Sequence, residues 1–137
     1  MILLQKNPSG ILISRHQSKE PEKMSSLHTI EKLLFDVLSA AKSIQGFSSN
    51  LNKQSFASNE LIQSACERKF EIIGEALNRL RKHFPEIAAD IPEVEKIIGF
   101  RNIIAHGYDI VDPEMVWDTI QLCIPRLIQD INKKISV

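Results

Sequence analysis

Long hydrophobic runs are absent from this 137-residue sequence. No apolar stretch approaches the ~20 residues that a membrane-spanning helix needs, and the N-terminal Met-Ile-Leu-Leu turns polar too soon for the continuous apolar region of a signal peptide. We therefore expect a cytoplasmic protein without a membrane partner. An excess of charge of either sign is also absent, because the formal net charge is zero. That balance argues against a protein that coats nucleic acid through a basic surface, although it leaves room for a local phosphate site.

Cysteine, glycine and proline are scarce. The two cysteines, Cys66 and Cys123, stand in helical patterns far apart in the sequence, and we expect two buried free thiols rather than a disulfide or a redox pair. The sequence contains neither a serine or cysteine nucleophile motif nor a glycine-rich loop that could cradle phosphates. With five glycines and six prolines to interrupt them, helix-forming residues dominate, and the length suits one domain with a hydrophobic core.

Apolar residues recur at intervals of three and four along most of the chain, which predicts amphipathic helices. We expect Gly46 and Gly107 to end two of them, and the clearest start is Asp112, an N-cap followed by Pro113 in the first helical position. Because the connections are short, the predicted fold class is all-α, an antiparallel four-helix bundle. The expected helices span about residues 26–45, 59–83, 92–106 and from 113 toward 135.

Residues 1–24 form an N-terminal appendage that differs from the rest. Two short apolar bursts, Ile2–Leu4 and Ile11–Ile13, flank a Pro-Ser-Gly turn signal and could pair as a small hairpin. The polar stretch that follows, residues 15–23, is predicted to be a flexible connector. We assign this appendage no role and expect the helical domain to occupy residues 25–137.

The helix predicted over residues 59–83 carries a stripe of charged residues opposite its apolar face. The spacing of three and four suits a solvated face with weak ion pairs between neighbours, but a face turned toward a second subunit or a site would show the same pattern. Gly74, in the middle of this helix, costs about 1 kcal/mol relative to alanine and so indicates a close neighbour. The charged residues are Arg68, Glu71, Glu75, Arg79 and Lys82.

The segment Gly99–Asp109 gathers several residues that can carry chemistry. On a helical wheel, Arg101 falls in the middle of the face that would turn toward the core, where an unpaired guanidinium is costly. One interpretation is a buried salt bridge with Glu71 or Glu75. The other is an arginine that lines a polar cleft and grips an anion with its planar fork of donors, with those glutamates close behind it. The core face is defined by Val94, Ile97, Ile98, Ile104 and Ala105.

Asn102 and His106 lie four residues apart and therefore share one flank of the same helix. Histidine exchanges protons near neutral pH, and asparagine can orient it or bind a phosphate oxygen. Tyr108, the only tyrosine, puts a hydroxyl near the same place. His106, Asp109 and Asp112 match no strong metal-ligand spacing, and capping already explains Asp112, so we expect neither a metal nor another cofactor.

Arginine, asparagine and histidine suit one reaction that needs no metal, the cleavage of RNA by its own 2′-hydroxyl. That reaction requires a base, an acid and positive charge beside the pentacovalent phosphate. One histidine can be the base or the acid but hardly both at once, whereas a two-fold dimer supplies two histidines and two arginines to one cleft. The chemistry therefore predicts a homodimer with this segment at its interface, and Ile103, apolar on the side away from the core, fits that position.

The stretch Arg101-Asn-Ile-Ile-Ala-His106-Gly-Tyr108 resembles the Arg-x4-His-x-Tyr motif of HepT-like proteins, a branch of the HEPN superfamily. The stretch Arg68–Ala76 is similar to the second helix of that family, and Val111–Trp117 is similar to its fourth. The resemblance covers about Leu27 to Lys133, and residues 1–24 have no counterpart in the family pattern.

This resemblance implies a HEPN-like helical dimer with a metal-independent ribonuclease site at the subunit cleft. Arg101 and His106 would be catalytic, and Asn102 would be their polar companion. Proteins of this kind act as toxins, each paired with a small nucleotidyltransferase antitoxin that adenylylates the tyrosine of the motif, here Tyr108. The alternative is a non-enzymatic helical dimer that binds nucleotides or a partner protein through the same cleft, with Arg101 as an anion clamp. The zero net charge mildly favours that alternative.

Overall fold

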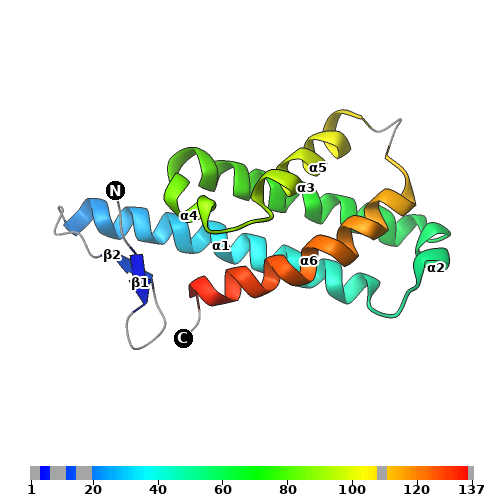
Figure 1. Cartoon of the computed structure of the whole chain (residues 1–137), viewed down its shortest axis with the longest axis horizontal. Helices are drawn as coiled ribbons and strands as arrows, with labels where there is room; N and C mark the ends of the chain where they lie inside the picture. The colour runs from blue at the N-terminus through cyan, green and yellow to red at the C-terminus, as the bar shows by residue number, and fades with distance from the viewer. Residues whose placement is uncertain (1–3, 7–11, 15–19, 108–110, 136–137) are drawn as a thin grey trace.

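The structure, a computed structural model, describes residues 4–6, 12–14, 20–107 and 111–135, with side chains described from residue 25 onward. Four long helices form a bundle, and two short helices connect them (Figure 1). The all-α prediction is therefore confirmed. The long helices are α1 (Glu20–Ser48), α3 (Glu60–His83), α5 (Val94–His106) and α6 (Pro113–Ile135), and the short ones are α2 (Lys53–Ala57) and α4 (Pro85–Ala89).

Helix α1 is longer at both ends than the sequence pattern predicts. It begins at Glu20 and so takes in the last residues of the stretch expected to be a flexible connector. The expectation that Gly46 ends it is wrong, because the helix continues through Gly46 to Ser48. Ser48 is buried and its hydroxyl donates a 2.8 Å hydrogen bond to the carbonyl of Ile44. We attribute the extra turn to its packing against the bundle, where Ser48 is buried; that packing offsets the roughly 1 kcal/mol that a glycine costs inside a helix.

Helices α3 and α6 begin where the sequence places them, because each start is fixed by a local capping side chain. The Oδ1 atom of Asn59 accepts a 3.0 Å hydrogen bond from the backbone N–H of Ile62. Asp112 Oδ1 accepts a 2.8 Å hydrogen bond from the backbone N–H of Met115. Helix α5 ends at His106, and Gly107 is its C-cap, as predicted. The N–H of Gly107 donates a hydrogen bond to the carbonyl of Ile103.

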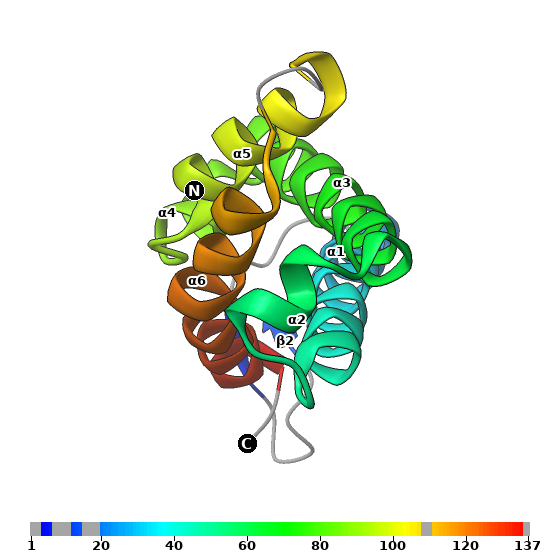
Figure 2. The same ribbon diagram turned by 90° about the vertical axis from the view of Figure 1, so that its right-hand side faces the viewer.

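The core lies between α1, α3, α5 and α6, which surround it in the end-on view of Figure 2. Helix α1 packs against α3 and α6, whereas α5 is carried mainly by α3. Both cysteines are buried and free, as expected. The ring of Phe100 meets the ring of Phe70 edge-on, with 4.9 Å between centroids, and this pair ties α5 to α3. The largest fully buried side chains include Ile30, Leu34, Ile73, Leu77, Ile97, Ile124 and Leu127.

The buried face of α5 is turned somewhat from the one predicted. Val94, Ile97, Ile98 and Ile104 are buried, as expected, but Ala105 is exposed and Phe100 is buried instead. The ring of Phe100 packs on Phe70, so the buried face of α5 is centred closer to Phe100 than predicted. Ala105 therefore lies at the opposite margin of that face. Figure 2 shows the C-terminal end of α5, in yellow, standing away from α1 at the edge of the bundle.

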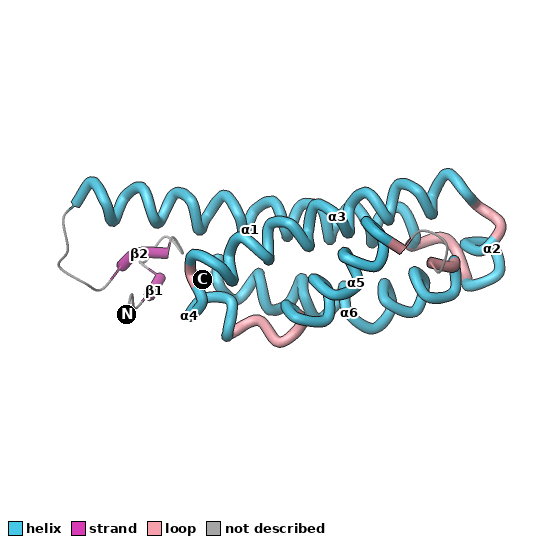
Figure 3. The backbone as a smooth tube through the Cα atoms, turned by 90° about the horizontal axis from the view of Figure 1, so that it is seen from above, coloured by secondary structure: helices cyan, strands magenta, loops and turns pink. Residues whose placement is uncertain are grey.

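A small hairpin lies beside the N-terminal half of α1 (Figure 3). Its strands, β1 (Leu4–Lys6) and β2 (Leu12–Ser14), pair antiparallel with Gln5 opposite Ile13. They overlap only in part with the two apolar bursts at the start of the chain: β1 shares Leu4 with the first, and β2 shares Leu12 and Ile13 with the second. Within the described ranges, no helix has the length and apolar character needed to cross a membrane.

Candidate functional site

The last two turns of α5 carry Arg101, Asn102 and His106, so the structure keeps these three predicted residues on one helix. That part of α5 projects at the edge of the bundle (Figure 1). Because it has α3 on one side and solvent on the other, it can present polar side chains without burying all of them.

Arg101 is half-buried, with its stem against α3 at Gly74. A Cβ atom added to Gly74 would lie only 2.3 Å from Cβ and 2.4 Å from Cγ of Arg101. The free-energy cost of a glycine inside a helix indicated that Gly74 has a close neighbour. That neighbour is Arg101, the arginine of the candidate site. The helical wheel predicted that Arg101 lies on the packed face of its helix, and this prediction is confirmed as well.

The guanidinium of Arg101 has one hydrogen bond in the described part of the chain. Nη1 donates to Oδ1 of Asn102 over 3.0 Å, while Nε is buried without a partner. The salt-bridge interpretation finds no support, since neither Glu71 nor Glu75 forms an ion pair with Arg101 there. Glu71 instead lies 3.5 Å from Arg68, and Glu75 is exposed. Among the described residues, the positive charge of Arg101 is thus left without a compensating carboxylate at contact distance.

His106 is the last residue of α5 and is exposed. It has no hydrogen bond or ion pair within the described residues, so its imidazole is available to another molecule. Residues five apart in an α-helix differ by about 140° around the axis and about 7.5 Å along it. Arg101 and His106 of one chain therefore leave the helix in different directions, and Asn102 lies between them on the helix surface.

Tyr108 and Asp109 lie outside the described residues, so the structure places neither beside His106. Within the described ranges, no three His, Cys, Asp or Glu side chains lie close enough together to hold a metal ion. Asp112 is occupied as the N-cap of α6, as the sequence indicated.

Glu67, a residue of α3 near the site, was not among the site residues predicted from the sequence. It stands seven residues before Gly74, two helical turns away, so both lie on the same side of α3. Its side chain is half-buried, and burial, followed by the negative charge of Glu71, raises the pKa of its carboxyl. The seven-residue spacing from Gly74 was the signal in the sequence that could have found it.

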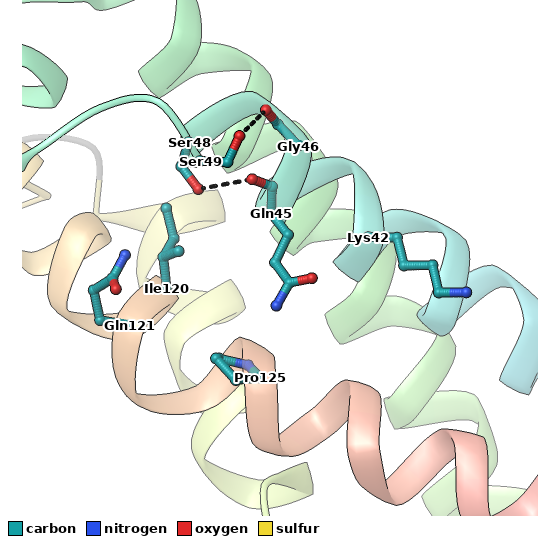
Figure 4. Close-up of a pocket in the computed structure, with 8 residues that line it drawn as sticks. All are labelled: Lys42, Gln45, Gly46, Ser48, Ser49, Ile120, Gln121 and Pro125. Atoms are coloured by element: carbon teal, nitrogen blue, oxygen red, sulfur yellow. Dashed lines mark hydrogen bonds between the residues drawn. The ribbon is translucent and has the colours of Figure 1, made fainter.

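An open groove lies on the surface between α1 and α6 (Figure 4). Lys42 and Gln45 line it from α1, and Ile120, Gln121 and Pro125 from α6. Pro125 lacks an N–H group, so it removes the helical hydrogen bond to the carbonyl of Gln121. The groove contains neither the arginine nor the histidine of α5, and one exposed lysine gives it little chemistry. The candidate site remains the C-terminal half of α5.

Comparison with known families gives one clear match. A family model described as "Ribonuclease HepT-like" matches residues 37–133, which include α3, α5 and most of α6. The candidate residues Arg101, Asn102 and His106 all lie within the matched range.

Several curated proteins are similar over most of this chain. A protein of Methanocaldococcus jannaschii named "Putative RNase MJ1380" is 28% identical over 107 residues, covering 78% of this chain and 97% of the relative. "Putative RNase MJ0125" from the same organism is 32% identical over 107 residues, covering 78% and 91%. "Probable ribonuclease HepT" of Thermococcus cleftensis is 31% identical over 94 residues, covering 69% and 84%. No solved structure matches the chain.

Proposed function

Because this chain belongs to the ribonuclease HepT-like family, we propose that it is an endoribonuclease that needs neither a metal ion nor another cofactor. The observation that carries this proposal is the state of Arg101. Its guanidinium is held at the surface of α5, bonded to the neutral amide of Asn102 and to no carboxylate of the described chain. An uncompensated cation in a fixed place suits a phosphodiester.

The reaction proceeds by attack within the RNA. A base removes the proton of a 2′-hydroxyl, and the 2′-oxygen forms a bond to the adjacent phosphorus. The bond from phosphorus to the 5′-oxygen breaks, and an acid gives that oxygen a proton. The products are a 2′,3′-cyclic phosphate and a 5′-hydroxyl. His106 serves as the base or the acid, and Arg101 stabilises the negative charge that develops on the phosphate oxygens.

The geometry of α5 favours a site shared between two copies of the chain. Since Arg101 and His106 of one chain diverge by about 140° around their helix, a phosphate bound to Arg101 is not automatically beside the same chain's His106. A two-fold dimer brings the second chain's α5 opposite the first and provides one histidine for each proton transfer. Ile103, half-buried on the side of α5 nearly opposite Arg101, gives such an interface an apolar contact.

We also propose that the enzyme is the toxin of a toxin–antitoxin pair. Its partner is a small nucleotidyltransferase that transfers AMP from ATP to the hydroxyl of Tyr108 and releases pyrophosphate. The support is the resemblance of the motif and the position of Tyr108, two residues after His106. AMP on that oxygen adds bulk and negative charge close to where the RNA phosphate binds, and so silences the ribonuclease.

A non-enzymatic dimer that binds nucleotides or a partner through the same cleft is the second candidate. The zero net charge of the chain favours it, because nucleases usually attract RNA with a basic surface. In that case Arg101 binds a phosphate group without any bond being broken.

Incubation of the purified partner-free protein with RNA in EDTA separates the two candidates. We expect cleavage that leaves 2′,3′-cyclic phosphate ends and that Arg101→Ala and His106→Ala each abolish. His83→Ala is the matched control, because His83 is also an exposed histidine at the last position of a helix, α3, and should cleave normally. If the folded wild-type dimer left RNA intact, the non-enzymatic binding dimer would be the remaining candidate. A nucleotidyltransferase gene beside this one would support the antitoxin assignment.

A further inference from the structure

Three glycines lie inside the described helices, and they differ in their surroundings. At Gly46 of α1 and Gly99 of α5, no other described atom would lie within 4 Å of an added Cβ. At Gly74 of α3 the same atom would overlap with the stem of Arg101. Only Gly74 therefore has a steric reason to be glycine, and that reason is the proposed catalytic arginine.

The overlap cannot be relieved by a change of rotamer. Real Cβ atoms essentially never lie within 3.0 Å of such a neighbour, and the nearest atom here, at 2.3 Å, is the Cβ of Arg101. The position of that Cβ is fixed by the backbone of α5. An added methyl group at Gly74 therefore has to push the two helices apart or rotate one of them.

The neighbouring contacts limit how α5 can move. Toward the start of α5, Glu95 forms an ion pair with Arg81 of α3. Phe100, next to Arg101, packs on Phe70, one turn before Gly74 on α3. Since these contacts hold the first half of α5, the movement would fall mainly on the last two turns, which carry Arg101 and His106.

We propose that Gly74 is a positioning residue for Arg101, an inference that rests on the proposed ribonuclease function. The missing side chain lets α5 settle against α3 until the stem of Arg101 is packed and its Nε is buried. The hydrogen bond from Nη1 to Asn102 holds the other end of the group. With both ends held, the guanidinium occupies one place before RNA arrives, and its conformational entropy is lost on folding rather than in the transition state.

The central experiment compares Gly74→Ala with Gly46→Ala, a change in α1 away from the proposed site. Both replace a glycine inside a helix by alanine, but only the first creates an overlap. We expect Gly74→Ala to lower kcat for RNA cleavage about 100-fold, the typical effect of a 1 Å displacement, with KM changed by less than about threefold because most RNA contacts remain. Gly46→Ala should keep kcat within about twofold of the wild type. A folded Gly74→Ala protein with wild-type kcat would overturn the inference.

A spectroscopic measurement separates positioning from general destabilisation. The Nε–H group of Arg101 is buried, so its NMR signal should be protected from exchange with water in the wild type and in Gly46→Ala. In Gly74→Ala we expect that protection to be lost while the signals of residues around Phe56 of α2 stay in place. Retained protection at Arg101 Nε–H in the folded variant would contradict the proposal.

A double variant covers the case in which Gly74→Ala does not fold. Arg101→Gly removes the Cβ and Cγ atoms that the new methyl group would meet. Gly74→Ala combined with Arg101→Gly should therefore fold and melt at least as high as Arg101→Gly alone. If the double variant melts far below Arg101→Gly alone, the contact is not the cause and the inference fails.

These readouts also separate this inference from the proposed function. If wild-type protein cleaves RNA and Arg101→Ala does not, but Gly74→Ala cleaves normally, only the role of Gly74 is lost. If wild-type protein leaves RNA intact, the proposed ribonuclease function is wrong, and so is a catalytic role for Gly74. The NMR and melting measurements would still decide whether Gly74 holds Arg101 in place.

Discussion

Nη1 of Arg101 donates a 3.0 Å hydrogen bond to Oδ1 of the next residue, Asn102. The partner is a neutral amide, so the bond fixes the direction of the guanidinium without neutralising its charge. A carboxylate in the same place would fix the direction equally well but would compete with phosphate for the cation.

Asn102→Asp tests that distinction. We expect it to lower kcat/KM for RNA at least as much as Asn102→Ala does, although it keeps an acceptor for Arg101. The alanine variant should lose about tenfold or more, because hydrogen bonds to charged groups contribute about 1.5–3 kcal/mol and 1.36 kcal/mol is a factor of ten. The measurement is initial cleavage rate against RNA concentration for both variants.

The chain supplies a matched control for this change. Asn78 on α3 accepts a 2.8 Å hydrogen bond from Nη2 of Arg81, which repeats the arginine–asparagine pair away from α5's last turns. Asn78→Asp should leave cleavage unchanged. If Asn102→Asp cleaved RNA as fast as the wild type, the neutral partner of Arg101 would have no catalytic meaning.

How much of the fold could be predicted depends on whether a helix end is set locally. Asn59 and Asp112 cap α3 and α6 with their own side chains, so a single sequence reveals those starts. Gly46 looks like a stop signal but lies inside α1, because the burial of Ser48 comes from tertiary packing that local patterns do not show. Helix ends decided by packing are therefore the ones that the sequence misplaces.

The candidate site shows the same division. The helical wheel placed Arg101 on the packed face of α5 from periodicity alone, and the cost of a helical glycine indicated that Gly74 has a neighbour. Spacing within one helix does not reveal that Arg101 and Gly74 are neighbours. Their contact depends on how α3 pairs with α5 and how closely the two helices pack. Glu67 differs, because its seven-residue spacing from Gly74 is visible in the sequence, but that spacing points to the site only once Gly74 is known to contact Arg101.

The N-cap of α6 gives a stability prediction that is independent of catalysis. Asp112→Ala removes the acceptor for the N–H of Met115 and should lower the free energy of unfolding by about 1 kcal/mol. Asp112→Asn keeps an Oδ1 acceptor and should stay within a few tenths of a kcal/mol of the wild type. Urea denaturation followed by circular dichroism measures both, and equal losses in the two variants would show that the charge rather than the cap matters.

Glu67 predicts a change of stability with pH. Burial, and then the charge of Glu71, raises the pKa of the Glu67 carboxyl in the folded state. A raised carboxyl pKa means that the folded protein favours the protonated form, so stability from this group is present at low pH and is lost as pH rises above about 4.5 through the folded pKa. Glu67→Gln should therefore raise the melting temperature at pH 7 and remove that part of the pH dependence.

Glu75→Gln is the control for Glu67, because Glu75 lies on the same helix but is exposed. Its melting temperature should follow the wild type across the same pH range. If Glu67→Gln lowered the melting temperature at pH 7, the carboxylate would be making a favourable contact in the folded state, contrary to the direction of its pKa.

Cys66 gives the last prediction, at the alkaline end. Burial, followed by the charge of Glu67, raises the pKa of the Cys66 thiol from 9.0 to about 11. The folded protein thus holds the thiol proton more tightly than the unfolded chain, so the stability from this group is complete below pH 9 and declines as pH rises toward about 11. At pH 8 the native thiol should react with a disulfide reagent far more slowly than the unfolded chain, because the thiolate is the reactive form and the side chain is fully buried. Cys66→Ala should flatten the fall in melting temperature between pH 9 and 11 relative to the wild type, and an unchanged fall would assign it to other groups.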